Sequence, residues 1–398
     1  MEDAKGDGKQ FIVSKAGTAC SLENIKDKKN YFKQWQEDLS FKRQDFPSIQ
    51  QLFYLAYEAG VLFETLPQPK SKLEGALIWR HEPQWSLCFD AEQAKVFISS
   101  TQSEAELDKI ESMLHATPSI TSEAALQIQP QEYHFDYQQA VRDVKDYIQA
   151  GDIFQANIAR FWSANVTQDK LLPLYTKLRE VNPAPFSCFV KADNLTIISA
   201  SPERLFSIGA DGEVAARPIA GTRKRSQGEA DDALQDELLL SEKERAEHIM
   251  LVDLERNDLG RVCDAGSIHV DECMVIEKYA TVQHIVSNVK GQLAEGLGLL
   301  DVLAAKFPGG TITGCPKVRC MEIIHELEPQ ARSVYTGGVG YMAWDGSVDM
   351  NILIRSFWHE NNTLNWAAGA GIVADSDPEH EQIETEHKVE GLLRAFDD

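Results

Sequence analysis

The stretch from Tyr335 to Ala374, YTGGVGYMAWDGSVDMNILIRSFWHENNTLNWAAGAGIVA, decides the fold class. It contains the strand-like runs YTGGVGYMAWDG, DMNILIRSFWHE and TLNWAAGAGIVA, which are separated by short turns. Strand-like runs that follow one another through short turns are typical of antiparallel pairing. The stretch therefore predicts an antiparallel sheet.

Similar runs recur upstream as PFSCFVKA, LTIISASPERLFSIG, GEVAARPIAG and SIHVDECMVIEKYATVQHIVSNVKG. Helix-like runs interrupt them around residues 229–257, 296–306, 316–327 and 379–396. A further helix is expected before Gly151, because Ala140, Val141, Val144 and Ile148 share one helical face and glycine is a common helix stop. Antiparallel strands with helices between them predict an α+β fold.

The first 130 residues are poorer in motifs. They combine a charged, helix-like opening with the strand-like pieces EGALIWR and WSLCFD, and they end in a helix-like run and a polar linker. We therefore expect an N-terminal subregion over residues 1–130 and a catalytic region over residues 131–398, folded as one intertwined globular unit.

Composition limits the class of protein. The chain has 398 residues, is 43% hydrophobic and carries a net charge of −23, which argues against nucleic acid or an acidic membrane as a partner. The polar opening MEDAKGDGKQ and the lack of a long apolar run predict a cytoplasmic protein. The seven cysteines form no C-x-x-C pair, which favours reduced, structural thiols.

Two predicted helices carry paired carboxylates. Glu244 and Glu247 are three residues apart, as are Glu381 and Glu384, and Lys388 falls on the same face as the second pair. Carboxylate oxygens offered by two helices suit Mg²⁺, particularly when the substrate supplies a carboxylate too. The alternative is a solvated acidic face, which each pair alone would favour.

Other candidates are ambiguous when taken singly. The runs FPGGTITGCPK, YTGGVGY and AAGAGIV contain backbone N–H groups that can hold a carboxylate, but tight turns have the same composition. None matches a dinucleotide or P-loop pattern, so nucleotide binding is not expected. By itself, His284 would be a structural histidine and Glu203 an exposed glutamate in a turn.

Taken together, the motifs carry a more specific signal. In chain order they are SPERLF, RPIAGTR, KERAEHIMLVDLERNDLGRV, HIVSNV, FPGGTITGCPKVRCMEII, NILIRSF and GAGIVADSDPEHE. This series resembles the chorismate-utilising enzymes, which include anthranilate synthase component I, aminodeoxychorismate synthase component I, isochorismate synthase and salicylate synthase. The resemblance is strong over about residues 135–398 and weak before them.

The resemblance implies two large antiparallel sheets packed as a sandwich with helices outside, and Mg²⁺ bound to the ring carboxylate of chorismate. It implies that the metal is held by Glu247 and Glu384 and, through water, by Glu244 and Glu381. The substrate-binding positions it implies are Gly221, Thr222, Thr311, Tyr335, Arg355, Gly369, Gly371 and Lys388. Glu203 matches the acid that protonates the departing 4-hydroxyl, and His284 matches a histidine beside the reacting ring.

Two positions indicate the nucleophile. Family members that add water have a lysine where this chain has Gln155, and a neutral amide is no general base. Ammonia needs none, so Gln155 favours an aminating enzyme. Ala220, in RPIAGTR, stands where many aminodeoxychorismate synthases have a lysine that attacks C2. Alanine excludes that covalent route and leaves room for ammonia to add at C2, giving 2-amino-2-deoxyisochorismate.

The product stays open at this point. Anthranilate synthases usually read PIAGT, and so does one branch of the aminodeoxychorismate synthases, which is understood to use a second ammonia at C4. The segments NPAPFSCF, QANIARF, YEAGVLFETLP and ELEPQARSVYTGGVGY are more similar to aminodeoxychorismate synthases, which favours that activity in 4-aminobenzoate and folate biosynthesis. Anthranilate synthase, in tryptophan biosynthesis, is the alternative, and a catalytically silent chorismate-binding regulator is a further one. For either enzyme, the family implies a glutamine amidotransferase subunit that supplies ammonia.

Overall fold

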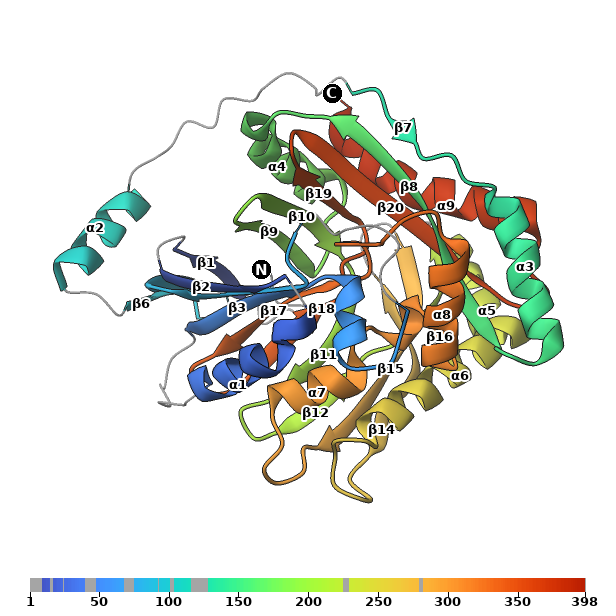
Figure 1. The fold of residues 1–398 in the computed structure, drawn as a ribbon, viewed down its shortest axis with the longest axis horizontal. Coiled ribbons are helices and arrows are strands. Elements are labelled where there is room, and N and C mark those ends of the chain that lie inside the picture. The colour runs from blue at the N-terminus through green and yellow to red at the C-terminus, as the bar shows by residue number, and fades with distance from the viewer. Residues whose placement is uncertain are drawn as a thin grey trace.

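The structure is a computed structural model that describes residues 9–14, 17–23, 25–39, 48–67, 75–91, 93–100, 104–115, 128–224, 229–278 and 282–397. Two large antiparallel sheets form its centre, with helices on their outer sides (Figure 1). The α+β class and the two-sheet architecture predicted from the sequence are confirmed.

The ten-stranded sheet has the strand order β13 (Ile219–Lys224), β15 (Val282–Gln292), β12 (Glu213–Ala216), β11 (Arg204–Ile208), β18 (Val348–Asn351), β17 (Gly338–Ala343), β3 (Ile49–Leu55), β4 (Ile78–Pro83) and β2 (Gly17–Leu22), with β14 (His269–Lys278) also paired to β15. Three strands of the N-terminal third, β2, β3 and β4, thus belong to the same sheet as strands that come after residue 200 in the sequence. The division at residue 130 stays a prediction.

The seven-stranded sheet has the order β16 (Gly314–Cys315), β8 (Gln155–Asn165), β20 (Thr363–Ile372), β19 (Ser356–Glu360), β10 (Leu195–Ser201) and β9 (Phe186–Ala192), with β7 (Gln131–Glu132) also paired to β8. A separate three-stranded sheet consists of β1 (Lys9–Val13), β5 (Trp85–Asp90) and β6 (Lys95–Ser100).

The helices are α1 (Lys28–Asp38), α2 (Glu104–His115), α3 (Tyr137–Ala150), α4 (Leu171–Val181), α5 (Glu229–Leu240), α6 (Glu242–Leu259), α7 (Leu299–Lys306), α8 (Lys317–Leu327) and α9 (Pro378–Leu393). Short 3-10 turns are η1 (Ile25–Asp27), η2 (Tyr57–Leu62), η3 (Gln168–Lys170), η4 (Gly310–Ile312) and η5 (Arg394–Phe396). None of the described helices has both the length and the apolar character needed to cross a membrane.

The period-two alternation of strand side chains separates the core into layers. On β3, Leu52 and Tyr54 face the space between the two sheets, whereas Phe53 belongs to the cluster beneath the ten-stranded sheet. On β8, Phe161 faces the inter-sheet layer and Trp162 packs under α4 and α9. Each large sheet is therefore buried on both faces, which explains the long apolar runs in the sequence.

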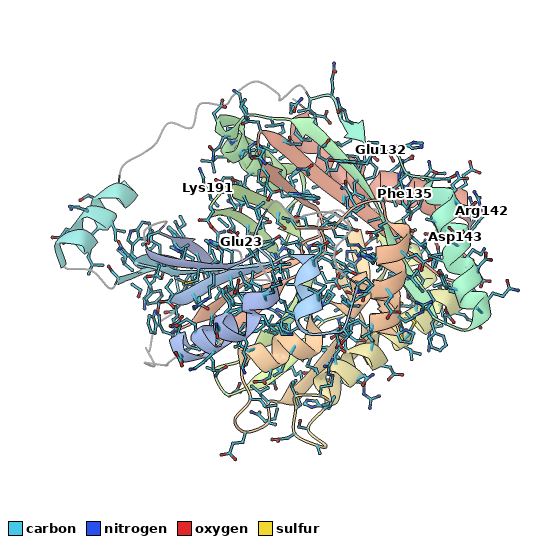
Figure 2. The ribbon with its side chains drawn as sticks, viewed as in Figure 1. Glu23, Glu132, Phe135, Arg142, Asp143 and Lys191 are labelled. Carbon is cyan, nitrogen blue, oxygen red and sulfur yellow. The ribbon has the colours of Figure 1, made fainter. Side chains whose placement is uncertain are left out.

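The helices mostly follow the predicted ranges. The expected run at 229–257 is divided at Ser241, whose side-chain oxygen accepts from the Glu244 N–H and begins α6 as a separate helix. Helix α4 was not anticipated, and it packs on β10. On α3 the predicted apolar face is buried against β8, Gly151 ends the helix with φ +83°, and Arg142 and Asp143 lie on the outer side (Figure 2).

Candidate active site

The chain passes several times from one large sheet to the other, and two of these crossings carry predicted site residues. Glu203 lies between β10 of the seven-stranded sheet and β11 of the ten-stranded sheet. Arg355 lies between β18 and β19, which make the crossing in the opposite direction, and its φ of +52° is unusual for a non-glycine residue. The Ile352 N–H donates to the Glu203 carbonyl oxygen at 3.0 Å, so the two crossings lie side by side.

Glu203 is not the exposed turn residue that its local sequence indicates. Its side chain is buried, and the Thr311 hydroxyl of η4 donates to its Oε1 at 2.7 Å. Burial raises the pKa of Glu203 from its ordinary value of 4.5 to about 7, against the opposing effects of the Thr311 hydrogen bond and of the charges on Lys306 and Lys388. A carboxyl of this kind can hold and release a proton near neutral pH.

A second group surrounds Lys388 of α9. Its Nζ pairs with Glu384 Oε1 at 2.5 Å and donates to the Gly369 carbonyl oxygen of β20 at 2.9 Å. Arg355 donates to the backbone carbonyl of Lys388. Burial lowers the pKa of the Arg355 guanidinium, while Tyr335 and Glu384 act in the opposite direction. This group therefore presents two cationic side chains, held in place by α9 and β20.

Tyr335 adjoins this group. The Gly369 backbone is hydrogen-bonded to its phenol, and burial raises the pKa of Tyr335 to about 12. The phenol thus keeps its proton and can donate to an anionic ligand.

A third group joins Gln155 of β8 to α6. Its Nε2 donates to Glu247 Oε1 at 3.2 Å, and its buried Oε1 has no hydrogen-bond partner. Gly371 faces this amide so closely that a Cβ at position 371 would overlap Gln155 Nε2. The site therefore contains an oriented amide that cannot act as a general base.

The fourth group is a bulge where β13 pairs with β15. Ala220 is opposite Ile285, Thr222 is opposite His284, and the register shifts between them at Gly221, whose φ is +61°. A Cβ on Gly221 would come within 2.8 Å of Glu244 Oε2. Ala220 is buried, as expected for a small side chain that leaves room, and the Thr222 side chain lies outside the described part.

His284 is fixed by this bulge. Its Nδ1 lies 3.2 Å from the Gly221 carbonyl oxygen, which can only accept, so Nδ1 carries the proton and Nε2 is the acceptor of the neutral ring. Burial is the largest influence and lowers the pKa of His284. The ring is therefore neutral at physiological pH.

Electrostatic contacts connect three of the four groups, and Gly371 of β20 connects the Gln155 group to them. Arg355 acts on His284 and Glu384, and Lys388 acts on Glu203. Gly369 and Gly371 are two residues apart on β20, which is covered by α9. The structure thus brings together residues that are scattered over more than 230 positions of the sequence.

The predicted metal ligands have different surroundings. Glu381 is buried and accepts from the Ser376 hydroxyl at 2.6 Å, whereas Glu384 is half-exposed and paired with Lys388. Within the ranges that the structure describes, no three His, Cys, Asp or Glu side chains gather as a complete metal site. The four glutamates are nevertheless all oxygen donors, and Mg²⁺ usually takes its remaining ligands from water and substrate.

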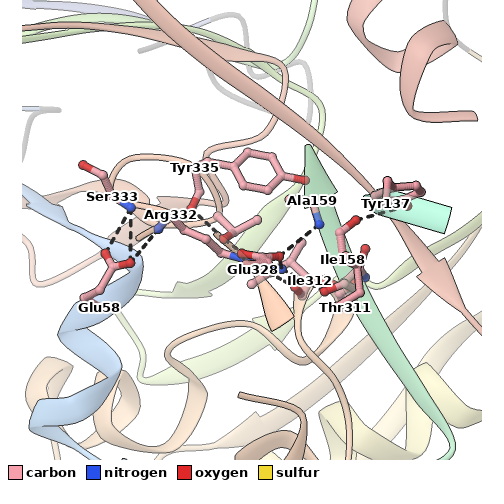
Figure 3. Close-up of polar contacts among 12 residues, drawn as sticks. Glu58, Tyr137, Ile158, Ala159, Thr311, Ile312, Glu328, Arg332, Ser333 and Tyr335 are labelled. Carbon is pink, nitrogen blue, oxygen red and sulfur yellow. Dashed lines mark hydrogen bonds and ion pairs between the residues drawn. The ribbon is translucent and has the colours of Figure 1, made fainter. Parts of the chain in front are cut away.

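Sequence reasoning missed the buried network that supports Tyr335 and Thr311 (Figure 3). The fully buried Arg332 guanidinium donates to Glu328 Oε2 at 2.9 Å and to the Ile312 carbonyl oxygen at 3.0 Å, next to Thr311. Glu328 also accepts from the Ala159 N–H of β8. Glu328 and Arg332 are four residues apart, which is compatible with an ion pair on one helical face. The spacing does not distinguish a buried pair from an exposed one.

The N-terminal third takes part in this network. Glu58 of η2 accepts from the backbone N–H groups of Arg332 and Ser333, at 2.7 Å and 3.1 Å (Figure 3). Burial raises the pKa of Glu58 to about 7. The turn that carries Tyr335 is thus anchored by a residue some 270 positions earlier in the sequence.

The sequence of this chain is similar to a protein family and to several known proteins. Residues 3–394 match the family described as chorismate binding enzyme. An "Anthranilate synthase component I-like protein" of Synechocystis sp. strain PCC 6803 is 42% identical over 356 residues, covering 87% of this chain and 72% of that protein. "Aminodeoxychorismate synthase component 1" of Bacillus subtilis strain 168 is 48% identical over 263 residues, covering 66% of this chain and 55% of that protein. The chain thus spans little more than half the length of the second relative.

A solved structure agrees with the family match. The crystal structure of anthranilate synthase component I from Streptococcus pneumoniae TIGR4 superposes with a TM-score of 0.86 at 29% identity, covering 96% of this chain and 92% of that one. The names of the relatives divide between two activities, while fold and family agree. The chain belongs to the chorismate binding enzyme family.

Proposed function

We propose that this protein is an aminodeoxychorismate synthase component I, which adds ammonia to chorismate at C2. The observation that carries amination is the buried Gln155 amide, whose nitrogen donates to Glu247. The segments NPAPFSCF and QANIARF and the likeness to the Bacillus subtilis relative support aminodeoxychorismate as the product. An enzyme that adds water needs a base to take a proton from it, and an amide cannot serve. Neutral ammonia is a stronger nucleophile than water and needs no base to activate it, so positioning and the exclusion of water are sufficient.

Glu203 is the proposed general acid. As ammonia bonds to C2, the 4-hydroxyl departs and takes the Glu203 proton to leave as water, while the new C–N group releases a proton in turn, which gives 2-amino-2-deoxyisochorismate. A second ammonia would then bond to C4 and release a proton, while the C2 amino group takes up a proton and leaves as ammonia, which gives aminodeoxychorismate. The pKa of about 7 supports this role, since an ordinary glutamate would be almost fully ionised at neutral pH. Ala220 has no nucleophile to offer, so no covalent link between this position and the substrate is expected.

The cationic group is the proposed anchor for the substrate carboxylates. Arg355 and Tyr335 would hold the enolpyruvyl carboxylate, and Lys388 with the backbone of Gly369 and Gly371 would lie near the ring carboxylate. A guanidinium suits a carboxylate because it donates two parallel hydrogen bonds. In this arrangement the reacting ring lies between Glu203 and His284.

Magnesium is the proposed cofactor. Glu247 and Glu384 would hold it directly, and Glu244 and Glu381 through water. The fit rests on hard oxygen donors from two helices, α6 and α9, in a site with cationic side chains for an anionic substrate. When bound, Mg²⁺ would draw charge from the ring carboxylate.

A glutamine amidotransferase subunit is the proposed partner, because free ammonia is mostly protonated at neutral pH. The relatives named as component I or component 1 support this view. Anthranilate synthase is the second candidate, supported by the name of the Synechocystis relative and by the likeness to the S. pneumoniae structure.

One assay tests these alternatives. The protein is incubated with chorismate, Mg²⁺ and ammonium at alkaline pH, and the products are identified by mass and fluorescence. We expect aminodeoxychorismate, which an added lyase converts to 4-aminobenzoate. Anthranilate with pyruvate would reject this proposal in favour of the second candidate. Chorismate binding without turnover would indicate a silent regulator.

A further inference from the structure

A buried ion pair lies behind the candidate acid. Lys306, the last residue of α7, is fully buried, and its ammonium group pairs with the carboxylate of Glu255 on α6, which is also buried. Lysine is rarely buried completely, because removing its charge from water is costly unless the charge is paired. The function proposed above assigns no task to this pair.

The pair lies close to Glu203 through two structural connections. Helix α7 packs against β11, which begins at the residue after Glu203. The chain that follows Lys306 leads into η4, where Thr311 donates its hydrogen bond to Glu203. When protonated, Lys306 favours the ionised form of Glu203. Burial and the charge on Lys317 lower the pKa of Lys306, and Glu203 acts in the opposite direction.

The other charges around Lys306 and Glu203 are paired as well. Lys317 of α8 bonds to Asp258 at 2.7 Å and to the Lys306 carbonyl oxygen at 3.2 Å. Lys388, which faces Glu203 from α9, is paired with Glu384. Two lysines and two carboxylates behind Glu203 are therefore paired with one another, which limits the positive charge that acts on the acid.

We propose that Glu255 and Lys306 are positioning residues that set the protonation of Glu203: by pairing with the Lys306 ammonium group, Glu255 limits the attraction of that charge for the Glu203 carboxylate. This inference rests on the proposed role of Glu203 as a general acid. The physical reason is that charges interact strongly in a buried, weakly polar environment. An unpaired Lys306 would favour loss of the Glu203 proton. The carboxyl would then be ionised before the substrate binds and could not act as an acid.

The test uses opposite changes of charge. In Glu255→Gln, Lys306 loses its partner, so the pH at which activity declines on the alkaline side should fall by about one unit. In Lys306→Met, the attraction for the Glu203 carboxylate is lost. The pH at which activity declines on the alkaline side, the alkaline limb of the profile, should then rise by about one unit. The double variant should return close to the wild type. Turnover is measured across pH with free ammonia held constant, because its protonation also changes with pH.

Two controls separate this role from a structural one. Asp38→Asn breaks another pair with a buried arginine, in which Arg80 Nη2 of β4 lies 2.6 Å from Asp38 Oδ2, four strands away from β11 in the sheet, and it should lower stability without changing the pH profile. Lys306→Arg keeps the charge and should also leave the pH profile unchanged, and Lys306→Gln serves as the second charge-removing variant if Lys306→Met does not fold. Equal shifts in one direction, no shift, or a shift in Asp38→Asn would overturn the proposal.

A direct readout distinguishes this inference from the proposed function. Infrared difference spectra report the protonated carboxyl of Glu203 as a band that is missing in Glu203→Gln. If that band titrates in opposite directions in Glu255→Gln and Lys306→Met but turnover does not follow, the ion pair has the proposed effect and the acid role of Glu203 is wrong. If the band does not move, the inference about the ion pair is wrong.

Discussion

Replacing Glu203 with glutamine should remove activity and stabilise the protein at the same time. With a pKa of about 7, roughly half of Glu203 is protonated at pH 7, against roughly 0.3% for a carboxyl at its ordinary value of 4.5. Loss of a general acid slows turnover by roughly a hundred- to ten-thousand-fold. Since glutamine keeps the shape and can still accept from Thr311, chorismate binding should change much less than turnover.

The stability effect depends on pH. Because the pKa of Glu203 is higher in the folded than in the unfolded chain, the folded protein binds more protons between pH 4.5 and 7, and the free energy of unfolding falls as pH rises through that range. Glutamine does not ionise. From pH 5 to pH 8 the variant should therefore gain about 2.5 kcal/mol over the wild type.

Urea unfolding of both proteins at the two pH values measures this difference, and initial rates with chorismate and ammonium measure turnover. Glu58 also has a raised pKa, but it is present in both proteins and cancels in the comparison. A stability difference that is the same at pH 5 and pH 8 would refute the assignment of a raised pKa. Equal losses in turnover and in chorismate affinity would refute the role of general acid.

Three further experiments test other parts of the site. Glu384→Gln should abolish Mg²⁺-dependent turnover. Circular dichroism should remain unchanged, because this side chain is half-exposed and outside the core. Activity that still depends on Mg²⁺, with an unchanged affinity for Mg²⁺, would contradict the metal assignment. Intact-mass measurements after incubation with chorismate should reveal no covalent adduct in the wild type, because Ala220 has no nucleophile, and an adduct would exclude direct attack by ammonia. Gly371→Ala should lower turnover at least tenfold, because the added Cβ would displace the Gln155 amide. Gly391→Ala is the control, because a Cβ there meets open space within α9. It should raise the free energy of unfolding by about 0.5–1 kcal/mol and leave rates unchanged. Equal rates in these two alanine variants would show that the Gln155 amide does not need its present position.

Local patterns in the sequence were sufficient for most of the fold. The short turns between Tyr335 and Ala374 predicted antiparallel strands, and the apolar face of residues 137–150 predicted α3, because both depend on neighbouring residues. The break at Ser241 was missed, since the helical pattern continues through it and the N-cap hydrogen bond depends on a local change in backbone direction. Helix α4 was missed because its N-cap residue, Lys170, makes no side-chain capping hydrogen bond and the helix follows a short 3-10 turn.

The site required more than local patterns. Glu203 reads as exposed in SPERLF, and its burial results from the passage of the chain from β10 to β11 with Thr311 packed above it. The partners of Arg332 are equally non-local, since Glu58 and Ile312 belong to distant segments. The resemblance to a family supplied residue positions, but pKa changes and buried pairs follow from tertiary packing, which no single segment encodes.

The pairing of β3 with β17 has a consequence for how the chain folds as it is made. Leu55 is opposite Gly338, so about 280 residues must be added after β3 before its partner leaves the ribosome. At typical translation rates this takes on the order of tens of seconds. During that interval β4 and β2 can already pair on one side of β3, while its other hydrogen-bonding edge stays open. An apolar strand with an open edge invites pairing with other nascent chains. Recovery of native protein should therefore depend on synthesis speed and on chaperones that shield that edge.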